Sequence, residues 1–391
     1  MVFSPTNRVR LVAVAMALTA LGTSIVWACQ VPVFRYALER WEADGYTVVF
    51  TPGKSGELTA KETEAFDFLR EAATSDEFPA NLLVKLSVTP APDSDAATMA
   101  LVYPQKVRGL EQSPIWSGAA TVENARRVFD SPARREIVKQ ILSGQSAVWL
   151  VVESGDEALD SKAVAAMETV IKDAPGTLKI PDGVIEQSDI DSIESPTNAP
   201  IDPENILQSN VPLKIDFGMI RISRDDPAEA VFLQMLLGLE ADLGEFSKEP
   251  MVFPIFGRGR VLEPLIGRGV TRDNAMDYAG YLTGACSCEV KDQNPGMDLL
   301  VAANWDLALE GSQIIIEKIL PPLEGLTGLG DAATAVDDAP IAVAADEPET
   351  QVFPLVRPMS FVLNMWWVVI GAVVIGVIAI GSVVIVRKKK S

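Results

Sequence analysis

The chain has 391 residues and a net charge of -20 at neutral pH, from 33 basic and 53 acidic side chains. So large an acidic excess argues against nucleic-acid binding, which needs basic surface to replace phosphate counterions. Histidine is absent. This absence excludes serine–histidine–aspartate and cysteine–histidine nucleophiles, the histidine-based zinc-protease site and histidine-ligated haem or copper.

Residues 1–28 have the pattern of a secretory signal peptide. Arg8 and Arg10 give a positive start, an apolar run follows, and a small residue, Ala28, ends the segment. Cys29 comes directly after it, at the position where lipoprotein signals place the lipidated cysteine. Three interpretations stay open: simple cleavage, lipidation of Cys29 and an uncleaved anchor.

Residues 29–145 are predicted to form a first α/β domain. Its expected elements are helices over 31–41 and 60–73, strands over 46–50, 82–88, 99–103 and 115–118, and a helical region over 121–144. Thr59 and Glu62 have the spacing of a capping box for the second helix. The basic residues of the last region indicate a solvated or ion-paired face, with a binding patch as the alternative: Arg126, Arg127, Arg134, Arg135 and Lys139.

The helix expected over 31–41 has an amphipathic pattern. Phe34, Leu38 and Trp41 share one face. The charged residues Arg35 and Glu39 fall elsewhere on its surface. The pattern predicts a helix that is buried on one side only.

Residues 146–310 are predicted to form a second α/β domain. Its expected elements are strands over 147–152, 214–223, 251–256, 261–266 and 298–302, and helices over 163–172, 227–240 and 271–282. Asp226 is the expected N-cap of the middle helix. Pro254 and Pro264 predict that their strands lie at a sheet edge. Residues 181–213 lack Lys and Arg and are rich in proline and carboxylates, which indicates an acidic insertion.

The C-terminal part reads as a stalk, an anchor and a tail. Residues 311–360 include an acidic, Ala- and Pro-rich stretch typical of an extended stalk. Residues 362–386 carry no charge, and about 20 apolar residues are enough to cross a hydrocarbon core. The basic residues of the tail 387–391 predict that this end stays in the cytoplasm.

The second region resembles the end of a thioredoxin-like fold. The resemblance rests on the strand that opens at Pro250, the turn at 257–260 and the step from Ile266 to the last helix. It implies a cis-proline at Pro250. The Cys-x-x-Cys motif of that family is missing, since Thr51 to Gly56 and Ser154 to Glu157 hold no cysteine. The first region resembles the same fold less completely. The segments 28–41 and 281–296 also look like those of uncharacterised bacterial envelope proteins. The fold class expected from this is α/β, with two tandem thioredoxin-like domains outside the membrane and one C-terminal transmembrane helix.

Cys286 and Cys288 form the sharpest local motif. Residues two apart in a strand lie at the far limit of disulfide geometry, so a bond between them would be strained and easily reduced. The open interpretations are a structural pair, a labile redox pair and half of a soft-metal site. A tetrahedral zinc site would need two further ligands, from carboxylates or another chain.

Four arginines surround flexible glycines in the second region: Arg258, Arg260, Arg268 and Arg272. Guanidinium groups and backbone amides can hold a phosphate, a carboxylate or a lipid head group. The residues are therefore a candidate anion site. The alternative is that they are solvated or pair with the protein's own carboxylates.

These observations favour a non-catalytic, membrane-anchored envelope protein that presents two α/β domains to a protein partner and is accessory to a membrane complex. No catalytic residue and no cofactor is expected, and the partners are the membrane and an envelope protein, not nucleic acid. The bulk of the chain is expected outside the cytoplasm. The alternative is a thiol-redox or soft-metal protein that uses Cys286 and Cys288, and an enzyme with carboxylate chemistry is a third possibility.

Overall fold

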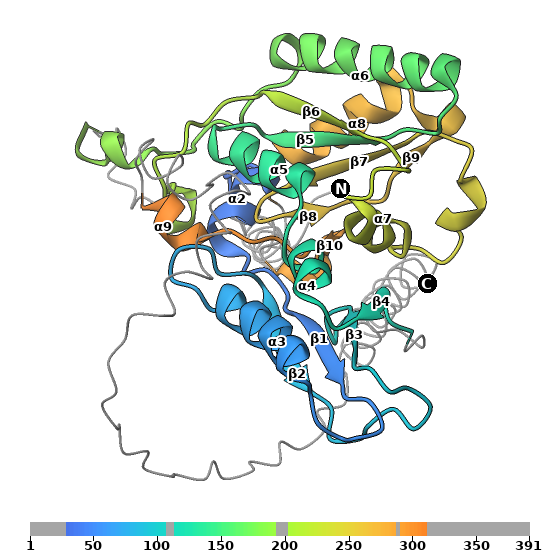
Figure 1. The fold of residues 1–391 in the computed structure, drawn as a ribbon. Helices are drawn as coiled ribbons and strands as arrows, with labels where there is room; N and C mark the ends of the chain where they lie inside the picture. The colour runs from blue at the N-terminus through green and yellow to red at the C-terminus, as the bar shows by residue number, and fades with distance from the viewer. Residues whose placement is uncertain (1–28, 107–112, 193–201, 287–289, 311–391) are drawn as a thin grey trace, which may run out of the picture. The chain divides into compact units, whose positions relative to one another are not determined.

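The computed structural model describes residues 29–106, 113–192, 202–286 and 290–310. All of them belong to one compact unit, which contains two β-sheets with their helices (Figure 1). The predicted signal peptide, stalk, membrane span and tail lie outside the described residues, as does Cys288.

The first sheet has the strand order β2-β1-β3-β4. Strand β1 pairs in parallel with β2 and antiparallel with β3, and β3 pairs antiparallel with β4. The elements are β1 Tyr46–Thr51, α3 Ala60–Ala73, β2 Leu82–Leu86, β3 Thr98–Val102 and β4 Trp116–Ala119. One face of the sheet packs on α3, where the rings of Phe50 and Phe66 lie 5.2 Å apart. The expected strands and the capped helix are confirmed here, with ends shifted by a few residues.

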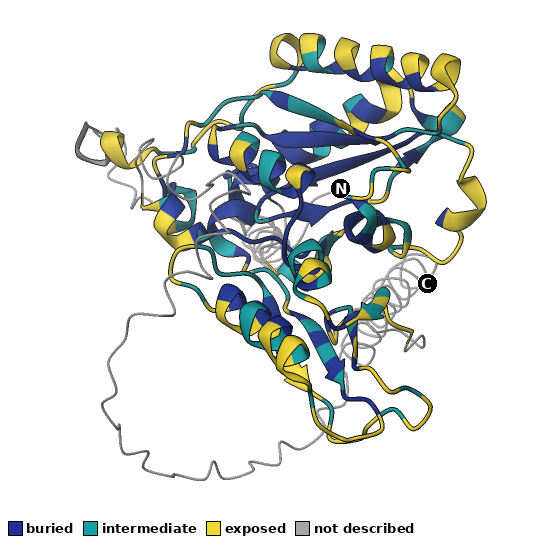
Figure 2. Cartoon of the chain, in the orientation of Figure 1, coloured by how far each residue is buried: buried dark blue, intermediate teal, exposed yellow. Residues whose placement is uncertain are grey.

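The second sheet has the order β10-β8-β7-β5-β6, and β9 also pairs with β7. Its elements are β5 Ala147–Val152, α6 Glu157–Thr177, β6 Phe217–Ile222, α7 Ala230–Leu237, β7 Met251–Phe256, β8 Arg260–Val261, β9 Leu265–Ile266, α8 Arg272–Thr283 and β10 Met297–Asp298. Strand β5 is buried along its whole length, and its sequence is an unbroken apolar run, as is usual for a strand covered on both faces (Figure 2). Trp149 packs toward α6 and α8, while Leu150 faces a core shared with the first sheet.

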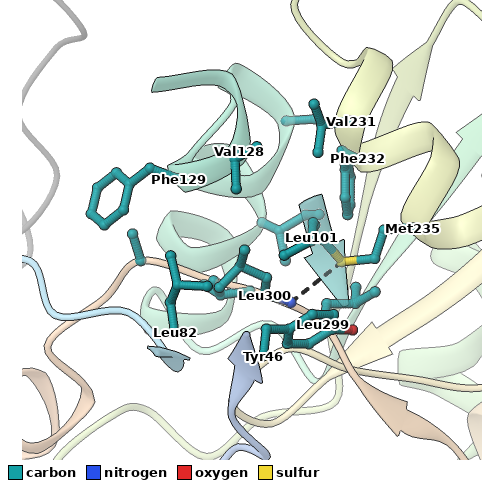
Figure 3. Close-up of a cluster of buried hydrophobic side chains, with 14 of the residues drawn as sticks. Tyr46, Leu82, Leu101, Val128, Phe129, Val231, Phe232, Met235, Leu299 and Leu300 are labelled. Atoms are coloured by element: carbon teal, nitrogen blue, oxygen red, sulfur yellow. Dashed lines mark hydrogen bonds between the residues drawn. The ribbon is translucent and has the colours of Figure 1, made fainter. Parts of the chain in front are cut away.

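That shared core contradicts the expected pair of tandem domains. One hydrophobic cluster joins Tyr46 and Leu101 of the first sheet to Leu150 and Phe253 of the second. Helix α4 (Val122–Phe129) supplies Phe129 to it, α5 (Pro132–Leu142) supplies Ile137, and α7 supplies Phe232 and Met235. The segment after β10 supplies Leu299 and Leu300 (Figure 3). The mixed α/β class holds, but both sheets are built around one interior.

The expected fold class also included a transmembrane helix over 362–386, which lies outside the described residues. Among the residues that the structure describes, no helix is both long and apolar enough to cross a membrane. The fold is therefore a mixed α/β fold with two sheets in one compact unit.

Helix α2, Val33–Arg40, is buried on all sides rather than on one. Its first residues join the end of α8, since the amide of Val33 donates to the carbonyl oxygen of Gly284 at 3.0 Å. The helix belongs to the core beneath the second sheet, with Phe34 and Trp41. The amphipathic pattern missed this because Arg35 and Glu39 neutralise each other inside the protein.

Two other expectations fail for identifiable reasons. Strand β7 is central, not an edge, although Pro254 lies within it. Pro254 lies between the part of β7 that pairs with β8 and the part that pairs with β9, and there its carbonyl oxygen accepts from the amide of Leu262. The N–H that proline lacks is therefore missing where the strand pairing is already interrupted. No described peptide bond is cis, so the cis-proline implied at Pro250 is wrong.

Helix α7 begins later than its capping pattern predicted. Asp226 accepts from the amide of Ala228 in a turn, and the helix starts at Ala230. The carboxylate of Glu229 is turned instead toward α5, where it accepts a hydrogen bond from the amide of Ala133 at 2.8 Å. The side chain of Glu229 therefore stabilises the start of a helix other than its own.

Candidate functional site

The four predicted anion-site arginines do not act together. Arg258 donates to the carbonyl oxygen of Leu38 at 2.9 Å and lies 3.4 Å from a carboxylate oxygen of Asp306. Arg260 is buried against Asp298, with 3.0 Å between Nη1 and Oδ1. Its other nitrogens donate to backbone carbonyl oxygens near β10. Both guanidinium groups therefore hold parts of the fold together.

The remaining two arginines lie at the start of α8. Arg272 Nε is 2.9 Å from Asp173 Oδ2 on α6. The hydrogen bond to Asp173 is the main cause that raises the pKa of Arg272. Arg268 is exposed in the short turn Gly267–Gly269. Three of the four candidate arginines thus pair with the protein's own carboxylates, which was the alternative interpretation of the sequence.

The two described cysteines are both buried in the core beneath the second sheet. Cys29 is 2% exposed, and its Sγ lies 3.5 Å from the carbonyl oxygen of Glu204, to which it donates. Cys286 is 1% exposed, and its amide donates to the carbonyl oxygen of Val31. Its predicted partner, Cys288, lies outside the described residues. Burial in apolar surroundings disfavours a thiolate, so the position of Cys286 gives no support to a reactive thiol.

No group of three or more cysteine or carboxylate side chains suited to a metal is found within the described ranges. Cys286 belongs to the same buried cluster as Val31 and Leu282. A soft-metal centre built on this cysteine would therefore need ligands from elsewhere.

Buried charges are the feature that the sequence did not reveal. Arg35 and Glu39 pair at 2.9 Å with side chains 1% and 0% exposed. Glu39 also accepts from the amides of Gln208 and Ser209, at 2.8 and 3.0 Å. Burial lowers the pKa of Arg35, and the charge of Glu39 opposes that shift. An arginine and a glutamate four apart are the pattern of an ordinary surface pair, so only packing reveals this site.

Arg134 is the second buried cation and was expected on a solvated helix face. It is 1% exposed and donates to the carbonyl oxygens of Val128, Phe129 and Leu300, at 3.0, 3.3 and 3.3 Å. Burial lowers its pKa, while the nearby carboxylate of Asp130 raises it. The Arg134 guanidinium group caps the C-terminal end of α4 and connects it to the segment after β10.

Strand β2 forms one edge of the first sheet, and β4 forms the other. Strand β2 pairs with β1 on one side, and no described strand pairs with it on the other. The carbonyl oxygen of Asn81 accepts from the amide of Tyr46, and the amide of Ser87 donates to the carbonyl oxygen of Phe50. The N–H and C=O groups of the odd-numbered residues of β2 therefore face β1. Backbone groups alternate along a strand. The N–H and C=O groups of Val84 and Leu86 therefore point outward.

This edge also carries exposed apolar side chains. Leu83 is 52% exposed, Leu86 is 49% exposed and Val88, just beyond the strand, is 99% exposed. Native sheets usually protect an edge with charge, proline or a covering element. Here Lys85 is the one charged residue of the strand. An unpaired edge with apolar side chains is suited to accept a further strand.

Comparison with known proteins gives no relative from which a role could be transferred. The chain matches no protein-family model, no curated protein and no solved structure. Function is therefore argued from the geometry alone.

Proposed function

We propose that this protein is a non-catalytic interaction protein that accepts an extended segment of a protein partner as an added strand on β2. The observation that carries the proposal is the outward-facing, unpaired backbone of Val84 and Leu86 beside the exposed side chain of Leu83. Main-chain hydrogen bonds would supply affinity in such a complex, and alternate side chains would supply specificity.

The charged groups of the described residues support this reading over an enzymatic one. Arg35, Arg134 and Arg260 are each committed to carbonyl oxygens or carboxylates of the fold. Two of the buried acids, Asp298 and Glu39, have basic partners. Glu229, which is 2% exposed, accepts instead from the amide of Ala133. An active site usually leaves such groups facing a cleft, where a substrate can reach them.

We further propose that the protein works outside the cytoplasm, in the cell envelope. This rests on the signal-like pattern of residues 1–28 and on the acidic composition. Protease should be added to cells whose outer envelope layer has been made permeable while the cytoplasmic membrane stays intact. It should digest the protein but leave a cytoplasmic marker protein undigested. Digestion only after cell lysis would contradict this location.

The strand-addition proposal is tested by photo-crosslinking in the cells that make the protein. A photoreactive amino acid at Leu83 should give one discrete adduct with another protein. The same group at Leu159, an exposed leucine of α6, is the matched control and should not give that adduct. Identical adducts from both positions would contradict the proposal, as would adducts that contain only a second copy of this chain.

The backbone contribution can be separated from the side chain at Leu86. Leu86→Pro removes an N–H that points away from β1, and proline is tolerated on an edge strand. It should abolish the Leu83 adduct, whereas Leu86→Ala, which keeps the N–H, should retain most of it. Equal adduct yields from the two variants would overturn strand addition, provided that both have the wild-type circular dichroism spectrum.

A further inference from the structure

A pocket of about 300 Å³ lies between α8 and the segments that flank it. It is lined by Leu262, Glu263, Asp277, Tyr278, Tyr281 and Pro295. None of these residues belongs to β2, so the pocket is independent of the proposed strand-addition edge. Its volume is at the lower end of the range of small-molecule sites.

Two tyrosine rings form one wall of the pocket. Tyr278 and Tyr281 are three residues apart on α8, and side chains at this spacing are neighbours on a helix surface. Both are half-buried. Tyr281 Oη lies 3.4 Å from Asn294 Oδ1 and donates to it, which connects this ring to the segment that carries Pro295. Leu262 is buried and contributes an apolar surface.

The electrostatic character of the pocket is negative. Glu263 and Asp277 line it with exposed carboxylates, and no lining residue is basic. Burial raises the pKa of the Tyr278 hydroxyl, and the negative charges of Glu263 and Glu240 raise it further. The pKa of Glu240 is raised by burial and by the charges of Glu263 and Asp242. The carboxylate of Glu263 therefore acts on both Tyr278 and Glu240.

The lining discriminates between kinds of cation. A hard metal ion needs several oxygen ligands that converge on one point, and no group of three or more candidate ligands is found in the described part of the chain. Tyrosine faces and apolar walls instead suit a cation that carries methyl or methylene groups. Such a cation gains attraction from the ring quadrupole as well as from the carboxylates.

We propose that this pocket binds a small organic cation with a methylated or quaternary ammonium head. The head group lies against the rings of Tyr278 and Tyr281, and Glu263 and Asp277 balance its charge. The apolar part of the ligand lies on Leu262 and Pro295.

The proposal is tested by titrating the intact protein with choline and with 3,3-dimethylbutan-1-ol, its neutral isostere, followed by NMR. Choline should bind saturably and the neutral isostere about tenfold more weakly or not at all, because the cation–π and carboxylate contributions need the positive charge. Equal binding of both compounds would overturn the proposal in favour of a merely apolar pocket. The absence of saturable choline binding would overturn it as well.

Variants locate the binding. Tyr278→Leu should weaken choline binding about tenfold, while Tyr278→Phe should retain it, because the ring face persists. Glu263→Gln should weaken binding. Asp273→Asn should not, because Asp273 is an exposed carboxylate of α8 that lies outside the pocket. If Tyr278→Leu and Glu263→Gln both bind choline as the wild type does, the ligand lies elsewhere and the proposal fails. All four variants leave β2 unchanged, so failure here leaves the strand-addition proposal untouched.

Discussion

Arg260 and Asp298 form a buried ion pair, with 3.0 Å between Nη1 and Oδ1 and side chains that are 6% and 5% exposed. The same aspartate connects the two sheets. Its Oδ2 accepts from the amide of Asp44 at 2.7 Å, and its carbonyl oxygen accepts from Tyr46 Oη at 2.8 Å. Lys291 also pairs with its carboxylate. Asp298 of β10 thus connects β8, the strand that pairs with β10, to the start of β1.

Asp298→Asn should destabilise the protein by about 3 kcal/mol or more, because it leaves the buried charge of Arg260 without its carboxylate partner. Urea unfolding would measure the loss. Asp306→Asn, which removes an exposed partner of Arg258, should cost less than about 1 kcal/mol and is the control. Hydrogen exchange should show lower protection for Val48 in the first sheet and Leu150 in the second. Lower protection in one sheet only would contradict a shared interior.

Met235→Leu should cost more than its nearly unchanged volume suggests. The amide of Leu300 donates to Met235 Sδ at 3.4 Å in the core of Figure 3. Leucine cannot accept this bond, and a buried donor left without a partner costs about 1–3 kcal/mol. Met167→Leu, in the core beneath the second sheet, makes the same exchange at a sulfur to which no described group donates. Equal free energies of unfolding for the two variants would show that the sulfur contact contributes nothing.

Thr59→Ala should destabilise the protein by about 1 kcal/mol through loss of the N-cap of α3. The Thr59 side chain accepts from the amide of Glu62, and the Glu62 carboxylate accepts from the amide of Thr59. Thr63→Ala makes the same substitution at an exposed position inside the helix, where alanine is favoured. Chemical denaturation should show a clearly larger loss of unfolding free energy for Thr59→Ala than for Thr63→Ala, or a loss for the first and a gain for the second.

Glu62 should make stability depend on pH in the acid range. Hydrogen bonds from the amides of Thr59 and Ala97 lower the pKa of this carboxyl. A carboxyl with a depressed pKa in the folded state stabilises the protein above its unfolded pKa and loses that effect as the pH falls through the folded pKa. The stability difference between wild type and Glu62→Gln should thus be full at pH 7 and narrow below about pH 4.3. Urea titrations at pH 7, 4 and 3 would test this, with Glu64→Gln as control for charge removal from α3; a constant difference would contradict it.

Local patterns predicted most elements because the relevant interactions are close in sequence. The capping box at Thr59 and Glu62 and the apolar run of β5 each depend on neighbours within a few residues. The helix around Arg35 and the region around Arg134 were misjudged for the opposite reason. Their partners, Ser209 and Leu300, lie more than 160 residues away along the chain.

The candidate sites show the same division. The arginines 258, 260, 268 and 272 looked like a cluster because they are close in sequence, but Asp298 and Asp173 hold two of them in place. The edge of β2 could not be identified as an edge from its own residues, because edge position depends on which strand pairs beside it. The pocket at Tyr278 needs Leu262 and Pro295 from other segments.

By itself the sequence determined the acidic charge, the absence of histidine chemistry, the α/β class and the position of most helices and strands. Only the tertiary structure decided that both sheets share one interior, that Arg35, Arg134 and Arg260 are buried, and which backbone edge stays open. Helix and strand formation follows from short-range hydrogen bonding and periodicity. Burial of a charge and exposure of an edge depend on which distant segments supply or withhold a partner.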